Sequence, residues 1–328
     1  MDRRSIVKLI GTLPLLLPPP AFAENAPKTY RLGVLSPGPA ADEKSPFGKA
    51  LTAALAKRGY VLGKNLAYEA RGAGGHVDRL PRLLDELVAS KIDALVTQGY
   101  PSAAAMKKSG TSVPTVSLNS GDPVGTGLVK SLAHPGGNLT GISDVSAELA
   151  PKRLELLKEV TPKLRRVAIL WNADDLGMTL RYRASEAGAK ALGITIQPLG
   201  VREPDDFGQA FAAMTRDLPD GIMMVTDVLT LLNRKRVFDF AAAHRLPAIY
   251  EFGLLVREGG LMSYGPDDAE TLGRIAGLVA SILGGAKPGD LPFEQPTRFD
   301  LFVNVKTAKV LGLTVPRLVL AQADEVIE

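Results

Sequence analysis

Short apolar runs alternate along this chain with segments in which apolar residues recur every three or four positions. Continuous runs such as 94–96 and 222–226 are typical of strands that are buried on both faces of a parallel sheet. The spacing of the leucines over 80–88 is typical of an amphipathic helix. Strands that alternate with helices pair in parallel through right-handed crossovers. The pattern therefore predicts an α/β protein built on parallel sheets.

The same patterns place the individual elements. We expect strands over residues 30–35, 66–70, 94–96, 113–118, 167–171, 194–199, 222–226, 248–250, 261–262 and 298–303. We expect helices over residues 47–55, 80–88, 102–108, 151–160, 180–191, 207–214, 267–283 and 305–311. The β/α pattern restarts after residue 142, which predicts two lobes with more than one crossing between them. The first lobe is expected to comprise residues 28–143 plus about 266–290, and the second about 144–265 plus 294–328.

Polar and aromatic residues follow several runs at the point where a strand is expected to end. The carboxyl ends of parallel strands meet at one edge of a sheet, and ligands of open α/β sheets bind beyond that edge. Two such edges that face each other form a cleft, which is where small molecules bind. Besides Ser263 and Tyr264, the candidate cleft residues are Ser36, Gly99, Tyr100, Ser102, Asn119, Ser120, Asp122, Asn172, Asp227, Tyr250 and Glu251.

The carboxylates among these candidates also have structural interpretations. Asp227 follows four apolar residues and a threonine, and a charge at the edge of a core is costly unless it is paired. It either contacts a ligand or caps the helix that follows. Glu251 either faces the cleft or pairs with Arg245 or Arg257. Asp122 precedes a proline, which favours a turn whose backbone lines the cleft.

The remaining candidates have similar alternatives. Tyr250 either lines the cleft or packs in the core. Trp171 is the only tryptophan and has the pattern of a core residue, whereas Asn172 after it lies where a hydrogen-bond donor to a ligand is expected. Ser102 is expected to cap the short helix over 102–108.

The N-terminal residues have the composition of a secretory signal. Arg3, Arg4 and Lys8 precede an apolar stretch over 9–17, and the small-residue triplet Ala21-Phe22-Ala23 follows. This order predicts a signal peptide over 1–23 that is cleaved after its last residue. A membrane anchor is the alternative, but the apolar stretch is interrupted by prolines and is shorter than the roughly 20 residues that a bilayer span needs. We therefore expect a periplasmic protein.

Composition removes several classes of function. The formal net charge of +4 over 328 residues is small, and no basic stripe with interleaved aromatic residues indicates a nucleic-acid partner. The absence of cysteine excludes disulfides and cysteine-ligated metals. The three histidines lie outside the strand-end positions, and no G-x-S-x-G, H-E-x-x-H or phosphate-loop motif occurs. No cofactor and no metal is therefore expected.

Several longer segments resemble a known family. They are GDPVGTGLVKSLAHPGGNLTGIS at 121–143, KRLELLKE at 152–159, RLPAIYEFGLLVREGGLMSYGPD at 245–267, GAKPGDLPFEQPTRFDLFVNVKTAKVLGL at 285–313 and ADEVIE at 323–328. Together they resemble the type I periplasmic substrate-binding proteins of ABC importers, in the group that includes tryptophan- and tyrosine-type amino-acid binders.

The resemblance implies a fold and a division of roles. The fold would be two doubly wound parallel-sheet lobes joined by a multi-segment hinge, with the ligand between them. Asp227 and Glu251 would be candidates for the ligand ammonium. Tyr100 departs from the family, because relatives commonly have a small hydroxyl residue there. The residues that would face the ligand carboxylate are Ser36, Gly99, Tyr100, Ser102, Asn119 and Ser120.

The function that follows is the solute-binding component of an ABC importer. It would be a monomer that binds a small polar or amino-acid-like ligand and delivers it to a membrane permease. A periplasmic sensor that presents a ligand to a membrane receptor has the same sequence features. An enzyme on the same fold is the third class, since Asp227 and Glu251 together could perform acid–base chemistry.

Overall fold

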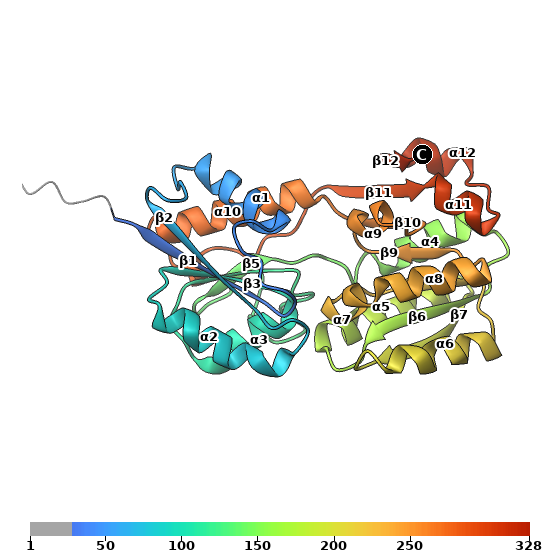
Figure 1. Ribbon diagram of the computed structural model, residues 1–328, viewed down its shortest axis with the longest axis horizontal. Coiled ribbons are helices and arrows are strands. Elements are labelled where there is room, and N and C mark those ends of the chain that lie inside the picture. Colours follow the sequence, from blue (N-terminus) through green and yellow to red (C-terminus); the bar gives the residue numbers. More distant parts are fainter. Residues whose placement is uncertain (1–27) are drawn as a thin grey trace, which may run out of the picture.

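The computed structural model describes residues 28–328, and its strands form two separate sheets. The sheets belong to two lobes that lie side by side and are joined by several crossing segments (Figure 1). The predicted signal peptide lies outside the described residues. Between residues 28 and 328, no helix is both long enough and apolar enough to cross a membrane.

The first lobe contains a five-stranded parallel sheet in the order β2-β1-β3-β4-β5. Helices cover both of its faces, α1 and α10 on one and α2 and α3 on the other (Figure 1). Helix α10 comes from a distant part of the chain and is fixed beside α1, where the Tyr60 hydroxyl donates to the Ala280 carbonyl at 3.2 Å. The elements are β1 (Tyr30–Ser36), α1 (Pro46–Ala56), β2 (Leu66–Gly72), η1 (Val77–Arg79), α2 (Leu80–Ala89), β3 (Ala94–Gln98), α3 (Gly99–Ser109), β4 (Thr115–Leu118), β5 (Leu139–Ile142), α10 (Asp268–Leu283) and η2 (Pro288–Asp290).

The second lobe contains a seven-stranded sheet in the order β12-β11-β10-β9-β8-β6-β7. All neighbours pair in parallel except β10 and β11. Helices α4, α5, α11 and α12 pack over one face, and α6, α8 and α9 over the other. The elements are α4 (Ala150–Val160), β6 (Arg166–Asn172), α5 (Leu176–Ala191), β7 (Thr195–Val201), α6 (Asp206–Arg216), β8 (Gly221–Met224), α7 (Val228–Leu232), α8 (Arg234–His244), β9 (Ala248–Tyr250), α9 (Gly253–Arg257), β10 (Met262–Pro266), β11 (Phe299–Asn304), α11 (Val305–Leu311), α12 (Arg317–Gln322) and β12 (Glu325–Ile327).

Within residues 28–328 the chain passes between the lobes after β5, between β10 and α10, and again before β11. Backbone hydrogen bonds hold these passages side by side. The Ser143 amide donates to the Glu294 carbonyl at 2.9 Å, and the Asp267 amide donates to the Arg298 carbonyl at 3.0 Å. The sequence prediction of an α/β protein with parallel sheets in two lobes is therefore confirmed.

Several boundaries differ from the sequence prediction. Helix α3 begins at Gly99, so Ser102 lies inside its first turn and does not cap it. Helix α5 begins at Leu176, one turn before the predicted start, because Asp175 caps it. Strand β10 extends to Pro266, which places Ser263 and Tyr264 within the strand and not beyond its end. The strand predicted over 298–303 is present but runs antiparallel to its neighbour β10, and β5, α12 and β12 were not predicted.

Candidate functional site

The two lobes touch along the edges where their parallel strands end. Gly38 follows β1, and a Cβ added to it would lie 2.7 Å from Cγ2 of Val228 in the other lobe. A Cβ on Gly177 would lie 3.4 Å from Cβ of Tyr100 and 3.7 Å from the Ser120 carbonyl oxygen. The turns after β1 and β4 and the start of α3 therefore face the N-termini of α7 and α5 across a closed interlobe space.

Asp175 is the most buried carboxylate at this interface that lacks a cationic partner. It is the N-cap of α5, and its Oδ1 accepts from the Met178 amide at 3.2 Å. The residue is 3 % exposed, yet its Oδ2 has no hydrogen-bond partner. Burial, together with the charge of Asp227, raises the pKa of this carboxyl to about 6. Asp175 was not among the candidates expected from the sequence, because the pattern predicted a start of this helix at residue 180.

Asp227 is both a helix cap and a neighbour of Asp175. Its Oδ1 accepts from the Thr230 amide at 2.9 Å, and the Thr230 hydroxyl accepts from the Asp227 amide at 2.9 Å, which completes a capping box. The amide nitrogen of Asn172 donates to Oδ2 at 2.6 Å. The predicted cap is therefore confirmed. Its contact with a ligand stays a prediction, as does that of Asn172.

Glu251 lies in a different environment. It is 1 % exposed, and its two carboxylate oxygens accept four hydrogen bonds. The Arg181 guanidinium donates at 2.8 Å and the Arg153 guanidinium at 3.3 Å. The remaining donors are the Ser146 hydroxyl at 3.1 Å and the Thr226 amide at 2.9 Å. The partners are therefore Arg153 and Arg181, and neither of the two arginines expected from sequence pairs with Glu251.

The two arginines extend this buried network to a passage between the lobes. Arg181 also pairs with Asp144, and Arg153 donates to the carbonyl of Ser146 at 2.9 Å. Val145 lies between Asp144 and Ser146, which these bonds hold in place. It has a φ of 46°, a left-handed conformation that is costly for a β-branched side chain. Arg153 and Arg181 thus neutralise Asp144 and Glu251, and their bonds hold the interlobe segment that follows β5 against the second lobe.

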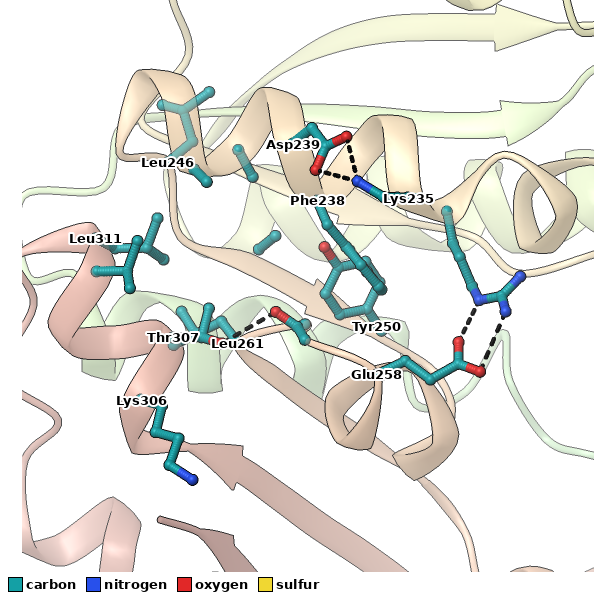
Figure 2. Close-up of a pocket in the computed structure, with 17 residues that line it drawn as sticks. Lys235, Phe238, Asp239, Leu246, Tyr250, Glu258, Leu261, Lys306, Thr307 and Leu311 are labelled. Atoms are coloured by element: carbon teal, nitrogen blue, oxygen red, sulfur yellow. Dashed lines mark hydrogen bonds and ion pairs between the residues drawn. The ribbon is translucent and has the colours of Figure 1, made fainter.

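Tyr250 is not brought to the facing edges. Successive side chains of a strand point to opposite faces, so Tyr250 points away from Glu251. Its ring packs edge-on against Phe238 at a centroid distance of 5.4 Å. Figure 2 shows it lining a hollow of about 580 Å³ between α8 and α11. The core alternative for Tyr250 is the one that the structure favours.

The first lobe supplies small hydroxyl residues to the interface. Ser102 and Ser120 are fully buried, and the hydroxyl oxygen of each has no partner. Ser36 is 5 % exposed, and its hydroxyl accepts from the Gly38 amide at 3.1 Å. Gly99 has a φ of 71° and forms the start of α3, where exposed helix amide groups favour negative charge.

Three further first-lobe candidates have distinct environments. Asp122 accepts from the Val124 amide at 3.0 Å and the Gly125 amide at 2.9 Å, which confirms the predicted turn. Burial raises the pKa of the Tyr100 hydroxyl, and the charge of Asp175 adds to the effect. Asn119 lines a hollow of about 280 Å³ between the lobes. This hollow also has an apolar wall, formed by Phe47, Leu118, Ile142, Phe252 and Leu272.

The unpaired buried oxygens give the interface its chemical character. Buried polar groups in folded proteins are nearly always hydrogen-bonded, so each exception needs a partner such as a ligand or water. At this interface the exceptions come from both lobes. On residues that border the interface, they are the hydroxyls of Ser102, Ser120 and Thr226, Oδ2 of Asp175, and Nε of Arg181, which is a donor. Within residues 28–328, no group of three or more His, Cys, Asp or Glu residues is arranged to hold a metal ion.

Comparison with known families decides the class of protein. Residues 37–327 match the family described as ABC transporter substrate-binding protein. The chain belongs to this family. The resemblance inferred from the sequence segments is thereby confirmed, and with it the type I periplasmic binding fold. The family consists of solute-binding proteins of the periplasm or cell exterior and is not an enzyme family.

Individual relatives of this family bind aromatic amino acids. The chain is 28 % identical over 266 residues to a tyrosine-binding protein of Clostridioides difficile (strain R20291), covering 81 % of this chain and 76 % of the relative. A structure from Streptococcus pneumoniae in complex with L-Trp superposes with a TM-score of 0.84 at 25 % identity, over 92 % of this chain and all of the other. A conserved domain protein from Vibrio cholerae superposes with a TM-score of 0.85 at 27 % identity, over 91 % of this chain and all of the other.

Proposed function

We propose that this protein is the periplasmic solute-binding component of an ABC importer. It would bind a small, amino-acid-like ligand between its lobes and release it, unchanged, to a membrane permease. The observation that supports this most strongly is the set of unpaired buried oxygens, which belong to residues of both lobes close to where the lobes touch. A ligand that satisfies them bonds to both lobes and holds them together.

The two sides of the interface suggest how such a ligand is oriented. The hydroxyls of Ser102 and Ser120 and the N-terminus of α3 would receive the carboxylate, because helix N-termini and hydroxyl groups stabilise negative charge. Asp227 would receive the ammonium. Glu251 is committed to Arg153 and Arg181, so we assign it to positioning and not to ligand contact.

Transport by this family of folds requires two lobes that separate and close. We propose that residues 28–143 with about 266–290 move as one body, and about 144–265 with 294–328 as the other. The cleaved signal peptide over 1–23 would place the monomeric protein in the periplasm. The interlobe contacts at Gly38 and Gly177 would then exist in the closed form and be lost in the open form.

The test is to purify the protein under native conditions, denature it, and identify released small molecules by mass spectrometry. We expect an amino-acid-like compound in a ratio near one per chain. The compound should then raise the melting temperature of stripped protein and reduce its radius of gyration in X-ray scattering. Turnover of the released compound, or the absence of any compound that binds, would overturn the proposal.

A further inference from the structure

Two carboxylates lie together at the second-lobe side of the interface. Asp175 caps α5 after β6, and Asp227 caps α7 after β8, so both lie beyond the carboxyl ends of neighbouring strands. Each uses Oδ1 for its own helix, and Asn172 occupies Oδ2 of Asp227. Oδ2 of Asp175 is left without a partner in a residue that is 3 % exposed.

Among residues 28–328, no cation is bonded to Asp175 or Asp227. Arg181, on α5, is the basic group that acts on Asp175; its terminal nitrogens bond to Asp144 and Glu251, and its buried Nε has no hydrogen-bond partner. From the first lobe, the group that faces Asp175 is Tyr100, on α3, which carries no positive charge. A buried and a partly buried negative charge without a bonded counter-charge are costly. Their cost is removed if the ligand supplies the positive charge.

We propose that Asp175 is a ligand-binding residue, and that Asp175 and Asp227 together select a ligand with two cationic groups, such as a basic amino acid or a diamine. This inference rests on the proposed function, because it concerns the ligand of the same interlobe site. It differs from the aromatic amino acids of the relatives in the charge of the ligand. On the first-lobe side, the backbone carbonyl of Ser120 and the side chain of Tyr100 would enclose the bound cationic group.

The raised pKa of Asp175 gives the inference a second signature. Near pH 6 the carboxyl of the ligand-free protein is partly protonated. A cation binds the ionised form, so binding must release a proton at this pH and affinity must rise with pH. Well below the pKa, linkage predicts up to about a tenfold gain in affinity per pH unit. Above the pKa the gain ends.

The experiment uses a defined panel of probes on stripped, full-length protein. L-lysine, L-ornithine, L-arginine and putrescine represent ligands with two cationic groups, and L-tyrosine and L-tryptophan represent neutral zwitterions. Isothermal titration at pH 7.5 and 5.5 gives affinity, and titration in buffers of different ionisation enthalpy gives the number of protons released. The variants are Asp175→Asn and, as a matched control, Asp174→Asn. Asp174 is adjacent but exposed and pairs with Arg202 at the surface.

We expect at least one of the ligands with two cationic groups to bind more tightly than either tyrosine or tryptophan. Asp175→Asn should weaken that binding by about 30-fold or more, since truncating one partner of a buried charge pair has effects of this size. Asp175→Asn should also abolish the pH dependence of the affinity and the release of protons on binding. Asp174→Asn should leave the affinity, its pH dependence and the proton release unchanged. Asparagine caps a helix about as well as aspartate, so the melting temperature reports whether the variant is folded.

Two results would overturn the inference, and they separate it from the proposed function. If only tyrosine or tryptophan binds and Asp175→Asn binds it as wild type does, Asp175 is not a ligand residue although the binding function stands. If no probe binds and denatured protein releases no small molecule, the proposed function fails as well.

Discussion

The second lobe holds two acidic pairs close to the interface, and they differ in how their charge is balanced. Asp144 and Glu251 are 3 % and 1 % exposed, and two arginines bond to them. Asp175 is equally buried and Asp227 is partly buried, yet neither is bonded to a cation. The charges of the first pair are neutralised by arginines of the same protein, so this pair has a structural role. The second pair has no bonded cation and retains an unpaired carboxylate oxygen that a ligand could bind.

The largest expected effect is on the balanced pair. Replacing Arg181 with methionine leaves Asp144 and Glu251 buried without their main partner, which should destabilise the protein by about 3–5 kcal/mol. Thermal and urea unfolding measure this. Arg202→Met is the control, because its exposed pair with Asp174 should contribute less than about 1 kcal/mol. Equal stability of the two variants would show that the buried network does not support the fold.

The next effect concerns Asp227, where stability and binding should separate. Asp227→Asn keeps the oxygen that caps α7 but loses the hydrogen bond from Asn172, so stability should fall by only about 1 kcal/mol. Loss of a desolvated partner of the ligand ammonium should weaken binding of the released ligand by about 2–5 kcal/mol, or roughly 30-fold to several thousand-fold. Titration beside a melting curve measures both. Affinity within about threefold of wild type would assign Asp227 to capping alone.

A smaller effect is expected for Asp175 in the ligand-free protein. Its folded-state pKa of about 6 lies above the ordinary value of 3.8, so the ionised form is disfavoured by folding. Its contribution to stability is complete below about pH 4 and is lost as pH rises through about 6. Asp175→Asn should therefore unfold like wild type near pH 4.5. At pH 7.5 it should be more stable by about 1–3 kcal/mol, at about 1.4 kcal/mol per pKa unit.

This difference between variants is measured as the change in melting temperature from pH 4.5 to 8. Comparing the two proteins at each pH removes the titration of all other groups. A constant difference across this range would mean that Asp175 has an ordinary pKa and that its repulsion with Asp227 is negligible.

The smallest effect is expected for the fluorescence of Trp171. The indole stacks on Tyr182 at a centroid distance of 3.9 Å within the second lobe. Lobe closure leaves that stack in place, so saturating ligand should change the emission only slightly while the radius of gyration falls. A large spectral shift would show that the second lobe rearranges internally and does not move as one body.

The sequence was sufficient for most of the fold because most buried strands carry their own signal; the buried strand β5 is the exception. The runs at 94–96 and 222–226 predicted β3 and β8 directly, and the leucines of α2 predicted its buried face. The antiparallel pairing of β10 with β11 could not be predicted, because an apolar run does not record the direction of its neighbour.

The site was less predictable, and the reasons are specific. Glu251 and its partner Arg181 are 70 positions apart in sequence and meet only through the packing of α5 against the sheet. Asp175 did have a local signal. An aspartate three residues after the end of a buried strand, at the start of a helical segment, is a common N-cap arrangement. Its missing partner, which makes it a functional candidate, is visible only in three dimensions.

The most direct test of the account is a crystal structure of protein purified with its ligand retained. The account predicts a small molecule between the lobes with a cationic nitrogen at about 2.7–2.9 Å from Oδ2 of Asp175, the range of charge-assisted hydrogen bonds. The guanidinium groups of Arg153 and Arg181 should remain on Glu251. A ligand whose only contacts are with Glu251, or that lies in the hollow between α8 and α11 (Figure 2), would contradict it.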